Sequence, residues 1–471
     1  MVSEDGIVMF FLRPFLRLQR RLWDYAVTLL FFVLKGWRRK TPLPPVFNPT
    51  LMHSAVDLAR YIREGKMSSV DVVRAYITRA SDVNPVLNAI TQESFKAALL
   101  QARRVDEMLN KGLKDGTLTV EMLERRRPFL GVPFTVKETI AVAGFPHTGG
   151  LVAREGLLSP SDASVVAKMR KAGAILLGTT NVSELGMWWE SDNKVYGRTN
   201  NPYDTRRTPG GSSGGEAALM CACGTPLSIG TDSGGSLRIP AFFCGLFSHK
   251  PTNGIVSVQG CNVHHHSQYS EIQSAGPISR HARDLSPVLA TLAGDRVSQL
   301  SLSKRGEINL WTEIMRSLLG RARHTVPSLA QAALDKLVGE ITFLKQQKRV
   351  LQGKEDAPLR QNSINDESVN KALQMKIQRL LGEDGVLLYP SHPTLAPYHS
   401  ESFFRPFNFA YTAIFNALGF PVTQVPLGLS PSGIPLGIQV VGGMYQDHIT
   451  IAVAQDLETA FGGWVCPSKI L

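Results

Sequence analysis

Two glycine- and serine-rich loops in the middle of this chain constrain its fold more than any other feature. They read Thr208-Pro-Gly-Gly-Ser-Ser-Gly-Gly-Glu216 and Gly230-Thr-Asp-Ser-Gly-Gly-Ser-Leu-Arg-Ile-Pro240, and each stands beside an apolar run. Because glycine loses more backbone freedom on folding than any other residue, ordering so many of them requires close backbone approaches or unusual torsions. The loops therefore indicate a site where backbone groups surround a reacting oxygen.

Strand and helix patterns alternate around these loops. An apolar run over 128–136 predicts a strand that ends at Lys137, and Ser161-Asp162 is expected to cap a helix over 163–172. A further helix is expected over 217–223, and further strands at 174–177, 226–229, 386–388, 421–425 and 436–441. This alternation predicts an α/β fold with a central mixed, largely parallel twisted sheet covered by helices on both faces.

The N-terminal segment, residues 1–40, mixes apolar stretches with basic residues. Its charge-free core, Tyr25 to Leu34, is shorter than the roughly 20 apolar residues of a perpendicular membrane-spanning helix. Trp23 and Trp37 flank this core as interfacial aromatics would, and no small-x-small cleavage site follows it. We therefore expect a retained membrane anchor at 1–40, spanning or lying in the interface, then a proline-rich linker at 41–50 and a catalytic domain at 51–471.

The net charge and the motifs limit the kinds of binding partner expected, and the cysteine count bears on disulfides. A formal charge of +12 favours an anionic partner, but the sequence contains no nucleic-acid-binding motif and no zinc spacing. The consecutive histidines His264–His266 do not converge on a metal ion and are interpreted as a solvated loop. With no binding motif in the sequence, we expect no metal, no cofactor and no nucleic acid. The chain has five cysteines, an odd number that argues against a disulfide framework. They are interpreted as small buried hydrophobic residues. Among them, Cys244 is an alternative nucleophile without a supporting histidine or glutamate.

Serine chemistry needs a base, and Lys137 is the candidate. A serine hydroxyl is a weak nucleophile without a base beside it, and no Gly-x-Ser-x-Gly elbow with a downstream Asp and His stands out. A lysine can serve if burial keeps it neutral, and Lys137 ends an apolar strand. Spacing alone leaves an ordinary surface lysine as the alternative. The loop from Thr231 to Ser236 offers successive N–H groups to an oxyanion.

Three motifs together resemble the amidase signature family of serine hydrolases. The two loops follow Gly131-Val-Pro-Phe-Thr-Val-Lys137 in the family's order and spacing. Resemblance extends over nearly the whole chain, through Asn200-Asn-Pro-Tyr203, Pro240-Ala-Phe-Phe243, His249-Lys-Pro251, Pro390-Ser-His-Pro393, Arg405–Tyr411 and Gly437–Gly442. With its N-terminal segment, the chain is most similar to the membrane-anchored members that hydrolyse fatty-acid amides.

The resemblance implies a role for each matched residue. Ser236 corresponds to the nucleophile, Ser212 to the bridging serine after a cis glycyl-serine peptide, and Lys137 to the base. The backbone N–H groups implied for the oxyanion hole are those of Ser233, Gly234, Gly235 and Ser236. Met187 is expected to line the acyl pocket, with a place in the core as the alternative. The residues expected to hold the loops are Ser213, Asp232 and Arg238.

The function expected from this resemblance is that of a membrane-associated serine hydrolase. It would cleave acylethanolamides or primary fatty-acid amides to a fatty acid and an amine through a Ser-Ser-Lys triad, at an intracellular membrane such as the endoplasmic reticulum or a lipid droplet. Its expected partners are the lipid amide and a membrane surface, with a homodimer as a further expectation. The alternatives are a soluble-type amidase or transamidosome amidase subunit, and an inactive membrane-bound lipid-binding protein.

The sequence signals for strands and helices become weaker between residues 281 and 385. A basic amphipathic stretch, Trp311–Leu319, suits either contact with a membrane or packing on the core as a surface helix. The interval from Ala293 to Trp311 is short for the family, and the polar stretch near 348–368 looks like added length. The shortened interval implies either that the sheet lacks an edge element there or that the chain is a variant form of the family.

Overall fold

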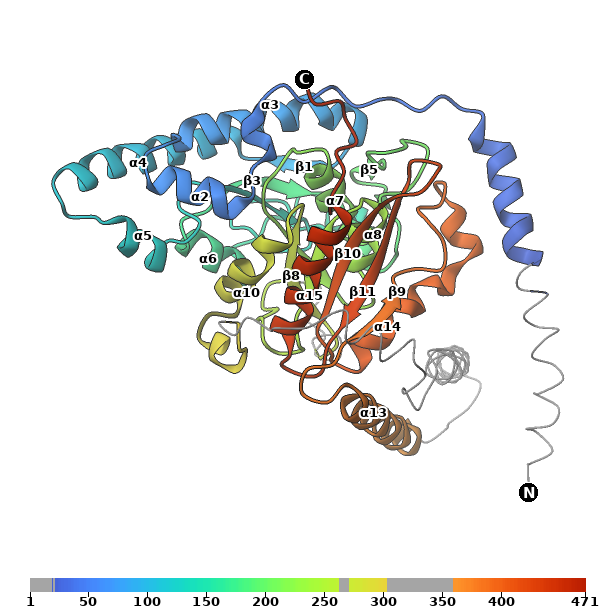
Figure 1. The fold of residues 1–471 in the computed structure, drawn as a ribbon. Coiled ribbons are helices and arrows are strands. Elements are labelled where there is room, and N and C mark those ends of the chain that lie inside the picture. The colour runs from blue at the N-terminus through green and yellow to red at the C-terminus, as the bar shows by residue number, and fades with distance from the viewer. Residues whose placement is uncertain (1–18, 20–21, 262–270, 303–358) are drawn as a thin grey trace.

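The computed structural model describes Gln19 and residues 22–261, 271–302 and 359–471, and a nine-stranded sheet lies at its centre (Figure 1). A second sheet of two short strands, β4 (Asp192–Asn193) and β5 (Gly197–Arg198), lies apart from it. The strand order of the large sheet is β1 (Ile90–Glu93), β3 (Ile175–Thr180), β2 (Pro133–Lys137), β6 (Ser228–Asp232), β8 (Ser274–Ser279), β7 (Phe247–Lys250), β10 (Val422–Leu429), β11 (Pro435–Val441) and β9 (Leu387–Pro390).

The mixed sheet and the α/β class are confirmed, but the sheet is less parallel than expected. In the described part of the chain, β2 runs parallel to β3 and to β6, and the other pairings of the large sheet are antiparallel. The helices α6 (Ser164–Lys171) and α7 (Gly214–Cys221) provide the crossovers that parallel strands require. Beyond β6, a short connection joins β10 to β11 and makes this pair an antiparallel hairpin.

Helices cover both faces of the sheet, as predicted. On β8, Ala275 belongs to a core shared with α10 (Leu285–Ala293) and α15 (Asp447–Phe461). Ile278 lies three residues further along the same strand and packs instead with α7 and α8 (Arg238–Phe243). Because side chains alternate along a strand, these two clusters lie on opposite faces. Figure 1 shows α10 and α15 in front of the strands and α7 and α8 behind them.

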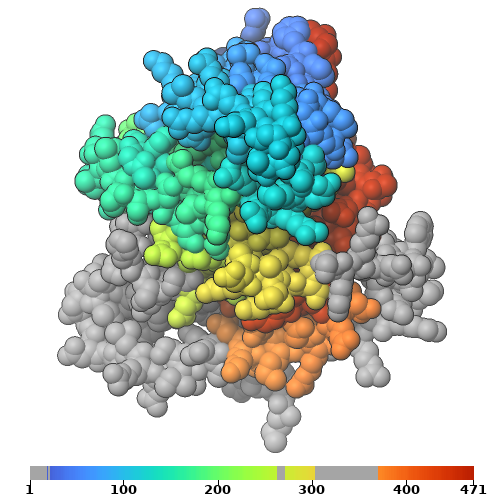
Figure 2. All heavy atoms as spheres, turned by 90° about the vertical axis from the view of Figure 1, so that its left-hand side faces the viewer, coloured from blue at the N-terminus to red at the C-terminus, as the bar shows by residue number. Residues whose placement is uncertain are grey.

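An N-terminal group of helices packs at the β1 end of the sheet. It consists of α2 (Ala55–Arg63), α3 (Ser69–Leu87), α4 (Phe95–Lys114) and α5 (Val120–Arg126). Ser54 and Ser68 begin α2 and α3 by accepting hydrogen bonds from Asp57 N and Asp71 N. Figure 2 shows this group above the segment that contains α10. The remaining long helices are α13 (Leu359–Leu381) and α14 (Ala410–Ala417).

The N-terminal segment is helical over 22–31 and continues as a π-helical turn, Phe32–Gly36. Val27 and Phe31 are buried against Tyr398, whereas most of its other apolar side chains are exposed. Nowhere in the described ranges is a helix both long and apolar enough to cross a bilayer. The predictions for His264–His266 and Trp311–Leu319, and the part of the interval from Ala293 to Trp311 that follows residue 302, lie outside the described residues.

The linker and the C-terminal tail pair with each other. Val46 N donates to Lys469 O at 2.8 Å, and Leu471 N donates to Val46 O at 2.9 Å. Arg79 of α3 is buried beneath them, with 3% of its surface exposed. Its guanidinium donates to four acceptors from three parts of the chain, which are Pro44 O, Pro45 O, Ala222 O and Ser468 Oγ. Arg79 therefore joins the linker, the end of α7 and the tail.

Replacing Arg79 by methionine should lower the free energy of unfolding by about 2–4 kcal/mol, because buried acceptors would lose a charged donor. Urea denaturation followed by tryptophan fluorescence measures the change. Arg74→Met is the control, since Arg74 lies on the same helix in an exposed pair with Asp71 and should cost less than about 0.5 kcal/mol. Equal stability of the two variants would contradict this role of Arg79.

Candidate active site

Lys137 lies at the carboxyl end of β2 and is buried, with 1% of its surface exposed. Its Nζ donates to Ser212 Oγ at 2.6 Å and to Thr231 Oγ1 at 2.9 Å. The surface-lysine alternative is therefore wrong for this side chain. Thr231 stands in the second glycine-rich loop, next to the predicted Asp232, but no role was predicted for it.

The first loop brings Ser212 to this lysine. Its Gly211–Ser212 peptide is cis, as the resemblance implied. A Cβ atom at Gly211 would lie 2.8 Å from Trp188 O and from Glu190 N, so the close approach to this neighbouring backbone requires glycine. Ser213 then precedes α7, and its N–H donates to Ser236 O at 3.2 Å, which joins the first loop to the second.

The second loop is held by a buried ion pair. Arg238 Nε donates to Asp232 Oδ2 at 2.9 Å, and both side chains are fully buried. Asp232 also accepts hydrogen bonds from Gly235 N at 2.7 Å and Leu237 N at 3.1 Å. Burial would raise the pKa of Asp232, but the charge and hydrogen bonds of Arg238 hold it well below its usual range. The pair therefore stays ionised and fixes the turn that carries Ser236.

The backbone amides of this turn are not equivalent. Gly235 N–H donates to Asp232, so in this structure it is engaged within the loop rather than with the cavity. Ser233, Gly234 and Ser236 line the cavity, and within the described ranges their N–H groups have no acceptor. These three amides are the ones positioned to receive an oxyanion.

Burial sets the protonation of the lysine. It lowers the pKa of Lys137 to about 7, and the charge of Asp232 is the largest influence in the opposite direction. Burial also raises the pKa of Glu216 on α7 to about 7, although Thr180 Oγ1 and Thr135 Oγ1 donate to its carboxylate at 2.6 and 2.7 Å. A large fraction of Lys137 is therefore a neutral amine at neutral pH and can accept a proton.

The cavity above this lysine has a volume of about 290 Å³ and has a polar and an apolar part. The polar part contains Lys137 and the serines of the two loops, and the apolar part is formed by Leu185, Met187, Trp188, Trp189, Ile239 and Phe409. Met187 is 65% exposed at this cavity, so it does not belong to the core. The arrangement suits an apolar substrate whose reacting carbonyl lies at the serines.

Two supporting residues come from the C-terminal part of the chain, where no site residue was predicted. Asn416 Nδ2 donates to Asp232 Oδ1 at 2.9 Å, and Arg238 donates to Gln439 Oε1 at 2.8 Å. Among the described residues, no group of three or more His, Cys, Asp or Glu side chains could hold a metal ion. Cys244 is buried and does not line the cavity, which contradicts the alternative that it is the nucleophile.

Comparison with known proteins gives concordant matches. The sequence model of the family described as Amidase matches residues 71–311. Fatty-acid amide hydrolase 2-B of Danio rerio is 40% identical over 92% of this chain and 94% of its own length. Fatty-acid amide hydrolase 2 of Homo sapiens is 39% identical over 91% and 93%, respectively. A solved fatty acid amide hydrolase has the same fold, with a TM-score of 0.70 over 89% of this chain and 87% of its own, at 22% identity.

The buried lysine should make stability depend on pH. Between about 7 and 10.5 the unfolded chain holds a proton on Lys137 that the folded chain lacks, so the contribution of this group to the free energy of unfolding rises with pH across that window and is flat below it. Relative to Lys137→Met, the wild type should gain on the order of 4 kcal/mol across the window, as measured by urea denaturation at each pH.

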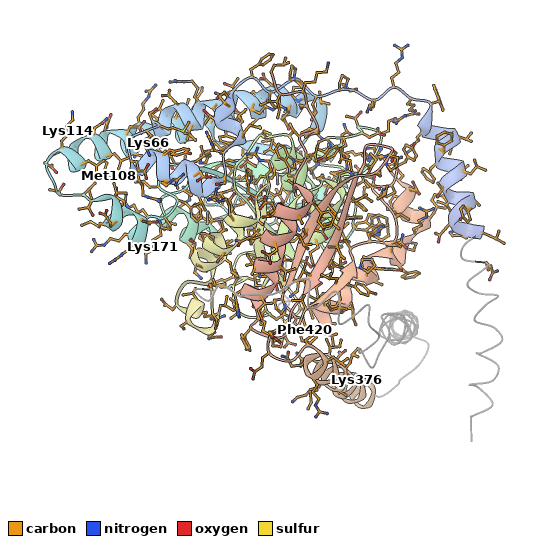
Figure 3. All side chains as sticks on the ribbon, viewed as in Figure 1. Lys66, Met108, Lys114, Lys171, Lys376 and Phe420 are labelled. Carbon is orange, nitrogen blue, oxygen red and sulfur yellow. The ribbon has the colours of Figure 1, made fainter. Side chains whose placement is uncertain are left out.

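The exposed Lys66, labelled in Figure 3, supplies the control for this pH series. Its side chain lies at the periphery beside Glu64, so Lys66→Met should leave the pH profile of the wild type unchanged. A Lys137→Met profile that runs parallel to that of the wild type would show that the lysine keeps its proton in the folded protein.

Proposed function

Because this chain belongs to the amidase signature family and is an amide hydrolase, we propose that it cleaves fatty-acid amides at a membrane surface through Ser236, Ser212 and Lys137. The observation that carries the proposal is the buried Lys137 amine 2.6 Å from Ser212 Oγ, in the same cavity as Ser236. Its substrates would be acylethanolamides and primary fatty-acid amides, in keeping with the names of its relatives.

The proposed reaction transfers a proton along the three side chains. Neutral Lys137 takes the proton of the Ser212 hydroxyl, Ser212 takes that of Ser236, and Ser236 Oγ attacks the amide carbonyl carbon. The oxyanion that forms lies against the amides of Ser233, Gly234 and Ser236. Ser212 then gives a proton to the amide nitrogen as the carbon–nitrogen bond breaks, and the Lys137 ammonium returns its proton to Ser212. Water hydrolyses the resulting acyl ester and restores Ser236.

The apolar part of the cavity supports a long acyl chain as the substrate's other end. Trp188 lines the cavity and stacks on Phe403, with ring centroids 5.5 Å apart. Phe403 is 67% exposed, so the apolar lining continues from the cavity to the molecular surface. An acyl chain longer than the cavity would be accommodated along this route.

Membrane association is supported by the surface around Phe403. Trp23 Nε1 donates to the neighbouring Phe404 O at 3.1 Å, and the Phe31 ring contacts that of Phe404 edge-on. The N-terminal helix thereby extends the exposed apolar surface beside the cavity, through Leu22, Leu29, Leu30, Phe32, Val33 and Leu34. Basic residues follow directly, at Lys35, Arg38, Arg39 and Lys40. Exposed apolar side chains with adjacent cations suit the headgroup region of a bilayer.

Ser236→Ala should lose covalent labelling by a fluorophosphonate and reduce kcat for a long-chain amide by about 10⁴-fold or more, because the attacking oxygen is removed. In-gel fluorescence and released fatty acid measure the two effects. Ser298 is an exposed serine of the 3-10 helix Gly294–Gln299, so Ser298→Ala is the control and should match the wild type. Equal labelling of wild type and Ser236→Ala, or no labelling of either, would contradict the assignment of the nucleophile.

The same assay distinguishes the alternative functions. A lipid amidase should have a higher kcat/KM for an oleoyl amide than for a butyryl amide, because more apolar surface is buried in the transition state. A preference for the short amide would favour a soluble-type or transamidosome amidase. Labelling without turnover of either amide would favour a lipid-binding protein.

Deletion of residues 1–40 should move the protein from the membrane pellet to the supernatant, because the main exposed apolar segment is lost. Sedimentation with phospholipid vesicles measures the distribution, and retained fluorophosphonate labelling verifies that the shortened protein is folded. Unchanged pelleting would contradict the anchor and direct attention to Trp311–Leu319.

A further inference from the structure

Two cysteines far apart in the sequence meet at the end of α7 that is remote from Ser212. Cys223 lies just beyond this helix, with a positive φ of 64° and no exposed surface. Cys466 lies in the C-terminal tail, is partly exposed, and its thiol hydrogen-bonds the sulfur of Cys223. No motif in the sequence indicated this pair.

A buried cation lies against the Cys223 sulfur. Arg280 Nη1 contacts Cys223 Sγ at 3.2 Å, and Arg280 Nη2 donates to Tyr76 Oη at 3.3 Å. The guanidinium of Arg280 also lies over the ring of Trp464, 5.0 Å from its centroid. Arg280 and Tyr76 are almost fully buried. Of the two atoms that contact this guanidinium, the Cys223 sulfur rather than the Tyr76 hydroxyl is the one to carry a negative charge, because burial raises the pKa of Tyr76.

Arg79 adds a second positive charge nearby. Its four acceptors are three carbonyl groups and one hydroxyl, all of them neutral. Within the described ranges, neither Arg79 nor Arg280 forms a salt bridge with a carboxylate. Because a buried cation is costly without a counter-charge, the two guanidiniums favour a thiolate at Cys223.

The acidity of the two thiols is consistent with this arrangement. Burial would raise the pKa of Cys223, but the hydrogen bond from Cys466 and the charges of Arg280 and Arg79 outweigh it and bring this pKa to about 6. The hydrogen bond to Cys223, together with burial, raises the pKa of Cys466. The two sulfurs therefore share one proton at neutral pH and titrate as a pair.

We propose that Cys223 and Cys466 form a redox-active dithiol, which a small disulfide such as oxidised glutathione converts to an intramolecular disulfide. This site is separate from the hydrolytic cavity, since neither cysteine lines it. Its chemistry does not depend on the proposed hydrolysis of lipid amides.

The partly exposed Cys466 is where the reaction begins. The Cys223 thiolate takes the proton of the Cys466 thiol as the Cys466 sulfur attacks one sulfur of the small disulfide, which forms a mixed disulfide and releases one small thiolate. Cys223 then loses its proton and attacks the Cys466 sulfur, which expels the second small thiolate. The protein loses two electrons and the small disulfide gains them. One proton for the two released thiols comes from the cysteine pair and one from water.

The other cysteines lack these features. Cys221, Cys244 and Cys261 are buried, and burial raises the pKa of each well above its ordinary value. Cys221 is two residues from Cys223 in the chain and offers a matched control for the site. Oxidation of Cys223 and Cys466 would join the tail covalently to the end of α7.

The test exposes the full-length protein to oxidised glutathione, blocks the remaining thiols in denaturant, and maps peptides without reduction. In the wild type, Cys223 and Cys466 should lose their free thiols together and appear as one linked peptide, while Cys221, Cys244 and Cys261 stay free. Cys223→Ala should retain glutathione on Cys466, because the resolving sulfur is gone. Cys466→Ala should remain fully reduced, and Cys221→Ala should behave like the wild type.

Three results would overturn the proposal. They are a wild-type protein that retains glutathione on Cys466, a wild-type protein that links Cys223 to a different cysteine, and one that keeps all its thiols. Each of these three results is measured on the wild-type protein, so none depends on whether a variant folds. Fluorophosphonate labelling of the same samples reports on Ser236 separately, so failure of the hydrolase assignment is distinguishable from failure of the dithiol.

Discussion

The removal of water from one amine is the constraint on which the site depends. Lys137 can act as a base because β2 ends inside the protein, where the ammonium form loses its hydration. Its two hydroxyl partners, Ser212 and Thr231, bond either form of the nitrogen, so the surroundings do not force it to be charged. A carboxylate in direct contact would restore the ordinary pKa. The ionised Asp232 is instead neutralised by Arg238.

The loops that meet this amine are held by distant parts of the chain. Arg238 reaches Asn416 of α14 and Gln439 of β11, which places the C-terminal strands in direct support of the turn at Ser236. The first loop packs against the backbone of Trp188 and Glu190, where Gly211 leaves room. The parallel strands thus supply the reacting groups, while the antiparallel half of the sheet supplies the residues that orient them.

The sequence alone predicted the features that depend on neighbouring residues or on a motif. The strand before Lys137 follows from residues adjacent in the chain, and the cis peptide at Ser212 follows from a motif. Contacts between distant segments were not accessible in this way. Asp162 was expected to cap α6, but its carboxylate accepts from Ala143 N and pairs with Arg170. The antiparallel pairings, the support from Asn416 and the meeting of Cys223 with Cys466 likewise depend on how remote segments pack.

The pairing of linker and tail bears on how the chain is made. Val46 emerges from the ribosome long before its backbone partners Lys469 and Leu471 are synthesised. The hydrogen bond from Arg79 to Ser468 likewise forms only after Ser468 has been synthesised. The N-terminal part of the domain therefore completes these hydrogen bonds only after residues 468–471 have been synthesised, so this closure comes late in the folding of the chain.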